Sequence, residues 1–158
     1  MEIQEAIKKD FSPIVEFILT KDKIDLTVKD ENEETLLHLA SISQKSDSLH
    51  YLLQKESVYN QLKIKDIDGN TPLHCAAEKS SSDFVSEFVE LIKSKPNDDL
   101  VDVNAKNNEE KTPLHLAAEI GFPKSIALLL TIPNINPNAK DNLQQTPLHL
   151  AAKKCSFK

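Results

Sequence analysis

The 158-residue chain has a formal net charge of −6 and 39% hydrophobic residues, which is the composition of a soluble globular domain. The acidic balance argues against a general surface for nucleic acids or anionic membranes, because both require clustered Lys and Arg. No apolar run is long enough to span a bilayer, and the N-terminus lacks the apolar core of a secretory signal. The two cysteines, Cys75 and Cys155, make neither a disulfide framework nor a metal-ligand spacing. We therefore expect an intracellular protein, cytoplasmic or nuclear.

The first predicted helix lies at the N-terminus, where Ile3, Ala6 and Ile7 recur at helical spacing. A second helix is predicted after Ser12-Pro13, because a capping residue followed by Pro is typical of a helix start. Its apolar positions also follow helical spacing, at Ile14, Val15, Ile18 and Leu19. The first 29 residues therefore predict a pair of helices.

From Thr35 onward one six-residue pattern occurs four times. It reads TLLHLA at Thr35, TPLHCA at Thr71, and TPLHLA at both Thr112 and Thr146, with starts 36, 41 and 34 residues apart. One structural unit therefore recurs, and its insertions must fall in loops. Thr can cap a helix, and Pro at the first helical position loses no hydrogen bond, so each copy predicts a helix start.

A second helix is predicted about ten residues after each of the first three copies. Its starts are marked by Ser46-Asp47, Ser82-Asp83 and Pro123. Each complete unit is thus a helical hairpin. Between Val89 and Asp102 the unit carries about eight extra residues, which predicts a longer second helix followed by a polar loop.

The TPLH turns, the small pairs such as Ala76-Ala77, and the loop sequences at 102–106 and 138–141 resemble the ankyrin repeat, whose unit has about 33 residues. The resemblance implies an all-α solenoid of stacked helix-turn-helix units with β-hairpin-like loops. It divides the single domain 1–158 into an N-terminal cap at about 1–29, units at 30–65, 66–106 and 107–140, and an incomplete unit at 141–158. The cap exposes charge at Glu2, Glu5, Lys8 and Lys9, as terminal units require. We expect at least one more helix beyond Lys158 in the natural protein.

The tips of the loops depart from the family pattern, which places a glycine there. Only Gly69 is kept, and Glu33, Glu110 and Gln144 occupy the equivalent positions. A non-glycine residue in the left-handed conformation costs on the order of 1 kcal/mol. We therefore expect these tips to be strained or rearranged.

Catalytic and metal-binding readings of the sequence are weak. The histidines His38, His74, His115 and His149 occupy equivalent places, but stacked helices lie roughly 8–10 Å apart and cannot share one metal ion. In the family this histidine holds the turn, and we read Cys75 as a small buried apolar residue. There is no nucleophile elbow, and two distant glycines cannot form a phosphate loop. Three carboxylate pairs, Glu33-Glu34, Asp98-Asp99 and Glu109-Glu110, fall in predicted loops. We interpret them as solvated charges, and the alternative is that they help to steer a basic partner. We expect no enzyme activity, no cofactor and no metal.

The family pattern implies that loop tips and first helices form a concave binding face. The residues expected there are Glu31, Asn32, Glu34, Ile42, Ile67, Asp68, Asn70, Glu78, Lys79, Asn108, Glu109, Lys111, Glu119, Ile120, Asn142, Leu143 and Gln145. Four of them, Ile42, Ile67, Ile120 and Leu143, are apolar, as the centre of an interface would be. The alternative is that each packs sideways on a neighbouring unit.

We accordingly expect a monomeric protein-interaction module, a scaffold or adaptor, that binds a basic or mixed-charge protein surface, with no nucleic acid and no membrane insertion. One alternative is a regulatory or substrate-targeting segment of a larger enzyme, such as a ligase or acyltransferase. Another is an inhibitor of a transcription factor, since residues 68–74 are similar to the inhibitors of NF-κB. The Lys-, Asn- and Ile-rich composition also leaves a pathogen effector open. Asn104 and Asn138 occupy a loop position that is hydroxylated in some ankyrin proteins, and hydrogen bonding within the loop is the competing role.

Overall fold

The computed structural model describes residues 3–9, 15, 17, 26–43, 47–79, 82–95 and 100–156. The predicted helix starts at Ser12-Pro13 and at Ser46 lie outside these residues. The helices that open the units form a first row, and they span Ile3–Lys8 (α1), Leu36–Ile42 (α3), Pro72–Glu78 (α5), Pro113–Ile120 (α7) and Pro147–Ser156 (α9). A second row contains Asp47–Leu53 (α4), Ser82–Ser94 (α6) and Pro123–Leu129 (α8). A short 3₁₀ helix, Glu56–Gln61, was not predicted.

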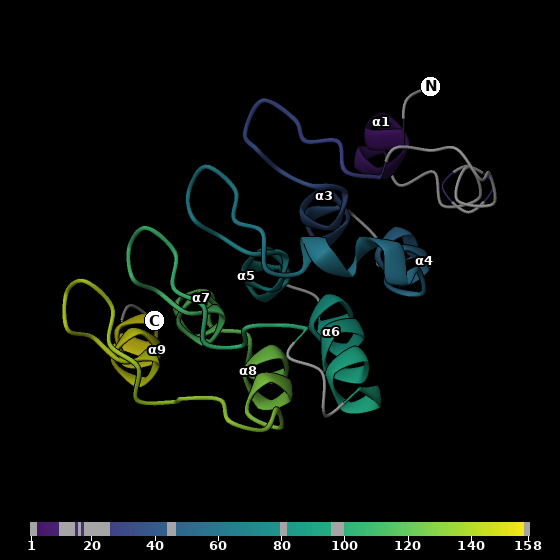
Figure 1. Ribbon diagram of the computed structural model, residues 1–158. Coiled ribbons are helices and arrows are strands. Elements are labelled where there is room, and N and C mark those ends of the chain that lie inside the picture. The colour runs from purple at the N-terminus through teal and green to yellow at the C-terminus, as the bar shows by residue number, and fades with distance from the viewer. Residues whose placement is uncertain are drawn as a thin grey trace.

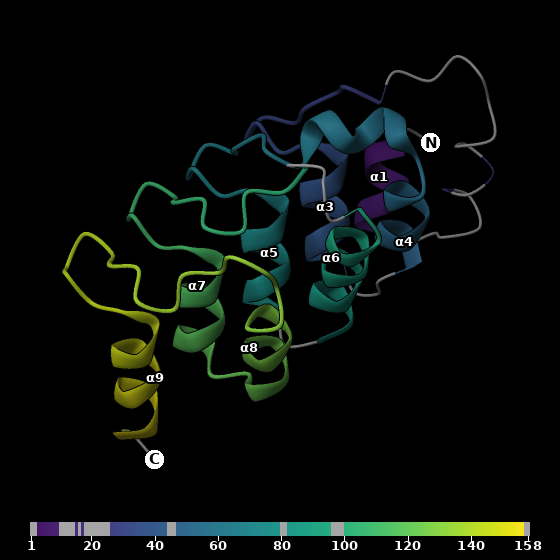
Figure 2. The ribbon, with the colours of Figure 1, turned by 60° about the horizontal axis from the view of Figure 1, so that its bottom comes forward.

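The units stack in sequence order, as the repeat predicts. Within the first row, α1 contacts α3, α3 contacts α5, α5 contacts α7, and α7 contacts α9. In the second row, α4 contacts α6 and α6 contacts α8. Figures 1 and 2 show the two rows side by side, with the loops extending from the first row on the side away from the second. The chain is therefore an all-α solenoid, and its loops are hairpin-like, with one isolated bridge between Lys29 and Thr35.

The core lies between the rows and between successive units. The third residue of each Thr-x-Leu-His turn, a leucine in all four copies, shows how one unit covers the previous one. Leu37 and Leu73 are fully buried and Leu114 is 3% exposed, whereas Leu148 in the last turn is 76% exposed. Burying a leucine side chain contributes about 2 kcal/mol, so each added unit stabilises the one before it.

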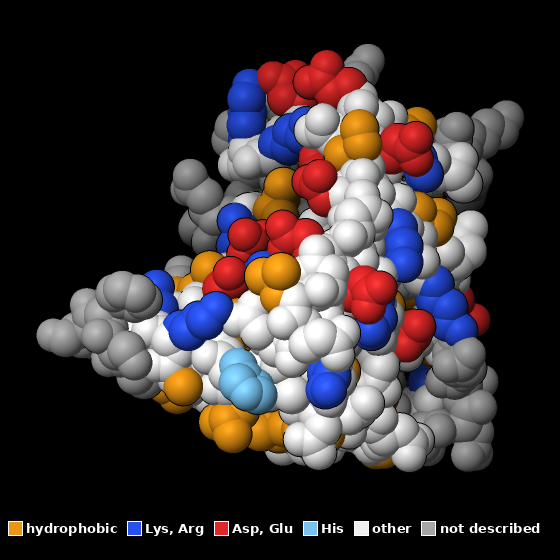
Figure 3. Space-filling model, turned by 90° about the vertical axis from the view of Figure 1, so that its left-hand side faces the viewer, with side chains coloured by type: hydrophobic (Ala, Val, Ile, Leu, Met, Phe, Trp, Pro, Cys, Tyr) orange, Lys and Arg blue, Asp and Glu red, His pale blue; other side chains and the backbone are white. Residues whose placement is uncertain are grey.

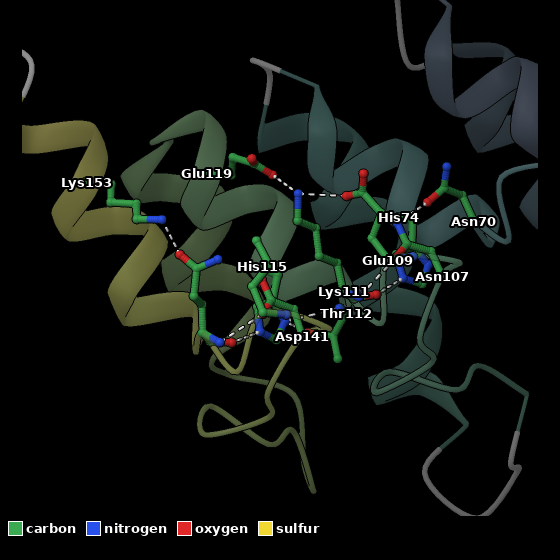
Figure 4. Close-up of polar contacts among 12 residues, drawn as sticks. Asn70, His74, Asn107, Glu109, Lys111, Thr112, His115, Glu119, Asp141 and Lys153 are labelled. Atoms are coloured by element: carbon green, nitrogen blue, oxygen red, sulfur yellow. Dashed lines mark hydrogen bonds and ion pairs between the residues drawn. The ribbon is translucent and has the colours of Figure 1, made fainter.

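A hydrogen-bonded histidine joins each unit to the next. In every turn the backbone N–H of the threonine donates to Nδ1 of the histidine, over 3.1 Å at Thr71 and His74. Because Nδ1 accepts a hydrogen bond there, the proton of the neutral ring lies on Nε2. Nε2 of His38, His74 and His115 then donates to the carbonyls of Asn70, Lys111 and Gln145 over 2.9, 3.0 and 3.1 Å. Figure 4 shows His74 and His115 in this arrangement.

Each loop tip is a five-residue turn with the same internal hydrogen bonds, at residues 30–34, 66–70, 107–111 and 141–145. The first residue, Asp or Asn, accepts the backbone N–H groups of the third and fifth residues through Oδ1. The fourth residue is left-handed in all four tips: φ is 59° at Glu33, 78° at Gly69, 57° at Glu110 and 60° at Gln144. The expectation of strained non-glycine tips is thus confirmed.

Successive tips are also hydrogen-bonded to each other. The backbone N–H groups of Ile67, Asn108 and Asn142 donate to the carbonyls of Asn32, Asp68 and Glu109, over 3.0, 3.0 and 3.1 Å. The tips therefore form one continuous ribbon along the stack, in which the backbone N–H groups of tips 66–70, 107–111 and 141–145 are hydrogen-bonded within a tip or to the previous one.

The bridging histidine predicts a large difference between two identical substitutions. We expect His74→Gln to lower the free energy of unfolding by about 2–4 kcal/mol, because it disrupts two buried hydrogen bonds. His149→Gln is the matched control, since His149 keeps the bonds to Thr146 but has no recorded acceptor for Nε2 among the described residues. Urea denaturation of both variants measures the difference. Equal losses would contradict a bridging role.

The same histidines predict that stability falls in mild acid. Burial lowers the pKa of His74 to about 4, and burial also lowers the pKa values of His38 and His115. A depressed pKa means that between pH 6.5 and about 4 the unfolded state binds protons that the folded state does not. The neutral histidines therefore contribute fully to stability above pH 6.5. The free energy of unfolding should decline from there toward pH 4, by on the order of 3 kcal/mol from His74 alone. Denaturation of wild type and His74→Gln across this range should show a shallower decline in the variant.

Gly69 predicts a third stability difference. A Cβ at this residue would lie 2.5 Å from Oδ1 and 2.8 Å from the backbone nitrogen of Asn108, in addition to the strain of a φ of +78°. We expect Gly69→Ala to lower the free energy of unfolding by about 2 kcal/mol. Gln144→Gly, at the equivalent residue of the last tip, should leave it within about 1 kcal/mol of wild type. Thermal and urea denaturation would test both, and a neutral Gly69→Ala would show that the tips yield readily.

Candidate protein-binding surface

The structure places most of the predicted binding residues on the tip ribbon. The second and third residues of each tip are exposed, and these are Glu31, Asn32, Ile67, Asp68, Asn108, Glu109, Asn142 and Leu143. The fifth residues are half-buried, because each leads directly into a first-row helix; they are Glu34, Asn70, Lys111 and Gln145. The hydrogen bonds between tips bring these four sets together along one edge of the stack.

The predicted helix residues differ in exposure. Glu78 and Glu119 are exposed, whereas Lys79, Ile42 and Ile120 are half-buried. Ile42 packs against the core, which favours the alternative of sideways packing for this residue. Ile67 and Leu143 have exposed fractions of 61% and 70%, so two apolar side chains of the predicted set project from the tips into solvent.

A lysine ties one tip to its helix. Nζ of Lys111 lies 2.8 Å from Oε2 of Glu109 in the same tip and 2.8 Å from Oε2 of Glu119 on α7 (Figure 4). Burial opposes the charged form, but the hydrogen bonds to the two carboxylates outweigh it and raise the pKa of Lys111. In the next unit Nζ of Lys153 donates to Oε1 of Gln145, so this tip is tied to α9 at the same spacing.

Charge is unevenly distributed along this side of the molecule. Figure 3 shows acidic side chains gathered over its upper and middle parts, with isolated hydrophobic side chains between them. The exposed predicted residues Glu31, Asp68, Glu78, Glu109 and Glu119 are acidic and belong to the tips and first-row helices of the units before the last. Two exposed lysines, Lys153 and Lys154, lie at the other end on α9.

Four of the predicted residues line one groove. It has a volume of about 300 Å³ and lies between tip 141–145 and helices α7 and α9. Lys111, Glu119, Leu143 and Gln145 contribute to it, together with Leu150 and the two lysines of α9. Sequence reasoning had assigned these residues separately to tips and helices.

Several residues that organise the surface were missed by the sequence analysis as functional positions. The first residues of the tips, Asp30, Asp66, Asn107 and Asp141, fix the tip backbone. The lysines that precede two of these tips bridge neighbouring units, since Nζ of Lys65 donates to the carbonyl of Lys106 over 2.6 Å. Nζ of Lys106 donates in turn to the carbonyl of Lys140 over 2.9 Å. The signal was present, because Asp or Asn occurs five residues before the threonine in all four copies.

The histidines and Cys75, which are residue types used in catalysis and metal binding, are buried or hydrogen-bonded within the fold. The rings of His38, His74 and His115 are hydrogen-bonded through both nitrogens, and burial raises the pKa of the Cys75 thiol. Within the described ranges no group of three or more His, Cys, Asp or Glu is arranged to hold a metal ion. None of the helices in those ranges is both long and apolar enough to cross a bilayer.

The loop asparagine Asn104 is also engaged. Its Nδ2 donates to the carbonyl of Asn134 over 2.8 Å, and its Oδ1 accepts the backbone N–H of Asn136 over 2.8 Å. The Asn104 side chain therefore has a hydrogen-bonding role, but its bonds connect two neighbouring units instead of staying within one loop. At the equivalent Asn138 the backbone N–H donates to Oδ1 of Asn136 over 3.0 Å.

The amino-acid sequence is similar to segments of several much longer proteins. The chain is 30% identical over 117 residues to a probable serine/threonine-protein kinase of Dictyostelium discoideum, which covers 72% of the chain and 11% of that protein. It is 34% identical over 104 residues to a homolog of transient receptor potential cation channel subfamily A member 1 of Caenorhabditis elegans, covering 66% of the chain and 8% of that protein. It is 29% identical over 103 residues to the nuclear factor NF-kappa-B p110 subunit of Drosophila melanogaster, covering 61% and 10%. The chain thus spans about a tenth of each of these relatives.

A family profile described as ankyrin repeats in three copies matches residues 3–100 and again residues 86–158. The two matches together cover nearly the whole chain, including all four Thr-x-Leu-His turns. With the stacked hairpins, the bridging histidines and the ribbon of tips, they establish that the chain belongs to the ankyrin-repeat family.

Proposed function

We propose that this chain binds a partner protein through the tip ribbon and the exposed side of the first-row helices. Ankyrin repeats are non-catalytic protein-interaction modules, and the carrying observation here is the placement of Ile67 and Leu143. Both are apolar and more than half exposed, on tips whose backbone N–H groups are already hydrogen-bonded. Apolar side chains rimmed by charge are the usual centre of an interface, so the side chains of the tips supply the recognition.

The charge of the surface indicates the kind of partner. The acidic residues of the tips and first-row helices favour a partner with basic groups over the middle of the stack, and Lys153 and Lys154 favour acidic groups at its C-terminal end. The partner segment is therefore of mixed charge. We place this interaction inside the cell, between a monomer of the chain and another protein.

A second candidate function is a regulatory or targeting segment of a longer protein. Its support is that the relatives include a probable kinase and a channel homolog, of which the chain matches only about a tenth. The binding surface would serve the same role there, by positioning a substrate or a regulator for another domain. Binding to a transcription factor, suggested by the likeness at residues 68–74, has the similarity to NF-kappa-B p110 as its support.

Two substitutions on the proposed face test the function. We expect Ile67→Asp and Ile120→Asp to weaken binding of a captured partner about tenfold or more, because each places a carboxylate in the interface centre. The melting temperature should change little, since neither residue packs in the core cluster. Partners captured from cell extract by the wild type are identified by mass spectrometry, and their dissociation constants are then measured by calorimetry.

The matched control is Ala127→Asp, which introduces the same charge at an exposed residue of α8 in the second row. Partners that this variant binds as tightly as the wild type, and that the two tip-side variants lose, support the proposal. If Ala127→Asp weakened binding as much as the other two, the partner would contact the second row instead. A large drop in melting temperature for Ile120→Asp would identify that residue as part of the core.

A further inference from the structure

The groove beside tip 141–145 is lined by both apolar and charged side chains. Leu143 projects from the tip with 70% of its surface exposed, and Leu150 on α9 lies beneath at 6%. At about 300 Å³ the groove is at the lower limit of ligand pockets, which run from roughly 300 to 1,000 Å³. This is room for one or two side chains of a peptide rather than for a large ligand.

The walls of this groove are held in place. The backbone N–H of Leu143 donates to Oδ1 of Asp141 over 2.9 Å, and the side chain of Lys153 is hydrogen-bonded to Gln145. On the opposite wall Lys111 joins Glu109 to Glu119. A site held in this way loses little conformational entropy when a ligand enters.

The charges at the two ends of the groove are opposite. Lys111 is paired with two carboxylates, so that cluster carries a net negative charge. Among the residues that the structure describes, neither Lys153 nor Lys154 lies within ion-pair distance of a carboxylate, and the recorded side-chain bond of Lys153 goes to the uncharged Gln145. The α9 end of the groove therefore presents two unneutralised ammonium groups next to an apolar floor.

We propose that this groove binds a peptide segment of the partner that places an apolar side chain on Leu143 and Leu150 and adjacent acidic side chains against Lys153 and Lys154. The inference rests on the proposed function and specifies the partner's chemistry at one place. Any basic residue of the same segment lies toward Glu109 and Glu119, which fixes the direction of the segment across the groove. Partial shelter by the groove walls strengthens these ion pairs relative to fully exposed ones.

A random peptide library displayed on phage tests the proposal without a known partner. Selection on the wild-type chain should enrich peptides with an apolar residue next to Asp or Glu. Selection on the Lys153→Glu/Lys154→Glu variant should enrich an apolar residue next to Lys or Arg, because the sign of the wall is reversed. The Lys93→Glu/Lys124→Glu variant has the same net charge but is changed on α6 and α8, and it should select the wild-type pattern.

A synthetic peptide from the wild-type selection then measures the site. We expect its dissociation constant to rise about tenfold for Lys153→Glu/Lys154→Glu and for Leu143→Asp, and to rise with added salt. The Lys153→Gln/Lys154→Gln variant keeps the side-chain length and removes only the charge, so it guards against a folding defect of the reversed variant. Circular dichroism melts establish that each variant is folded.

The outcomes separate this inference from the proposed function. Enrichment without an apolar-acidic pattern, or a pattern unchanged by reversal of the two lysines, would overturn the groove assignment. In that case loss of a captured partner by Ile67→Asp and Ile120→Asp would still support binding through the tips. Conversely, groove binding that survives while those two variants retain every captured partner would remove the wider interface and leave the groove as an isolated peptide site.

Discussion

The hydrogen bond from a buried imidazole Nε2–H to the last carbonyl of the following tip is the interaction on which the stack depends. In a neutral ring this bond requires the Nε2–H tautomer, and the threonine N–H that donates to Nδ1 selects that tautomer. One side chain thereby satisfies the start of its own helix and a carbonyl of the next unit. Because the bond recurs at His38, His74 and His115, it sets the register between units as well as their spacing.

The same register between units aligns the successive tips with one another. Each tip satisfies its own amides through an Asp or Asn at its first residue, and a further backbone bond to the previous tip completes the ribbon. The second and third residues of each tip differ widely in chemistry among the four copies. Asn108 and Glu109 also make side-chain bonds to neighbouring residues of the surface, to the carbonyl of Ile67 and to Lys111. This division between a constant backbone and variable side chains explains how one fold keeps its framework while its side chains specify a partner.

The surface is not uniform along the stack. In the two C-terminal tips a side chain reaches across to the first-row helix, through Lys111 to Glu119 and through Lys153 to Gln145. The equivalent pairs in the earlier units are Glu34 with Ile42 and Asn70 with Glu78, for which no such bond is recorded among the described residues. Rigid, apolar and locally basic, the region around Leu143 and Leu150 is therefore organised differently from the acidic face of the earlier units.

The sequence by itself determined the repeat and the two helices of each unit, because these features depend on local patterns of capping residues and apolar spacing. The strain at the fourth residue of the tips was expected from the resemblance to the ankyrin repeat, which has a glycine there. The sequence also placed the second and third residues of each tip at the surface, where they are exposed, but it did not distinguish them from the half-buried fifth residues. Only the tertiary structure decided that Ile42 packs on the core while Ile67 and Leu143 project outward. It also decided that Lys111 pairs with two carboxylates, whereas no described carboxylate lies within ion-pair distance of Lys153 or Lys154. Those outcomes depend on which residues the stacking of units brings side by side, although they are about 35 positions apart in the sequence. No local sequence pattern determines such contacts.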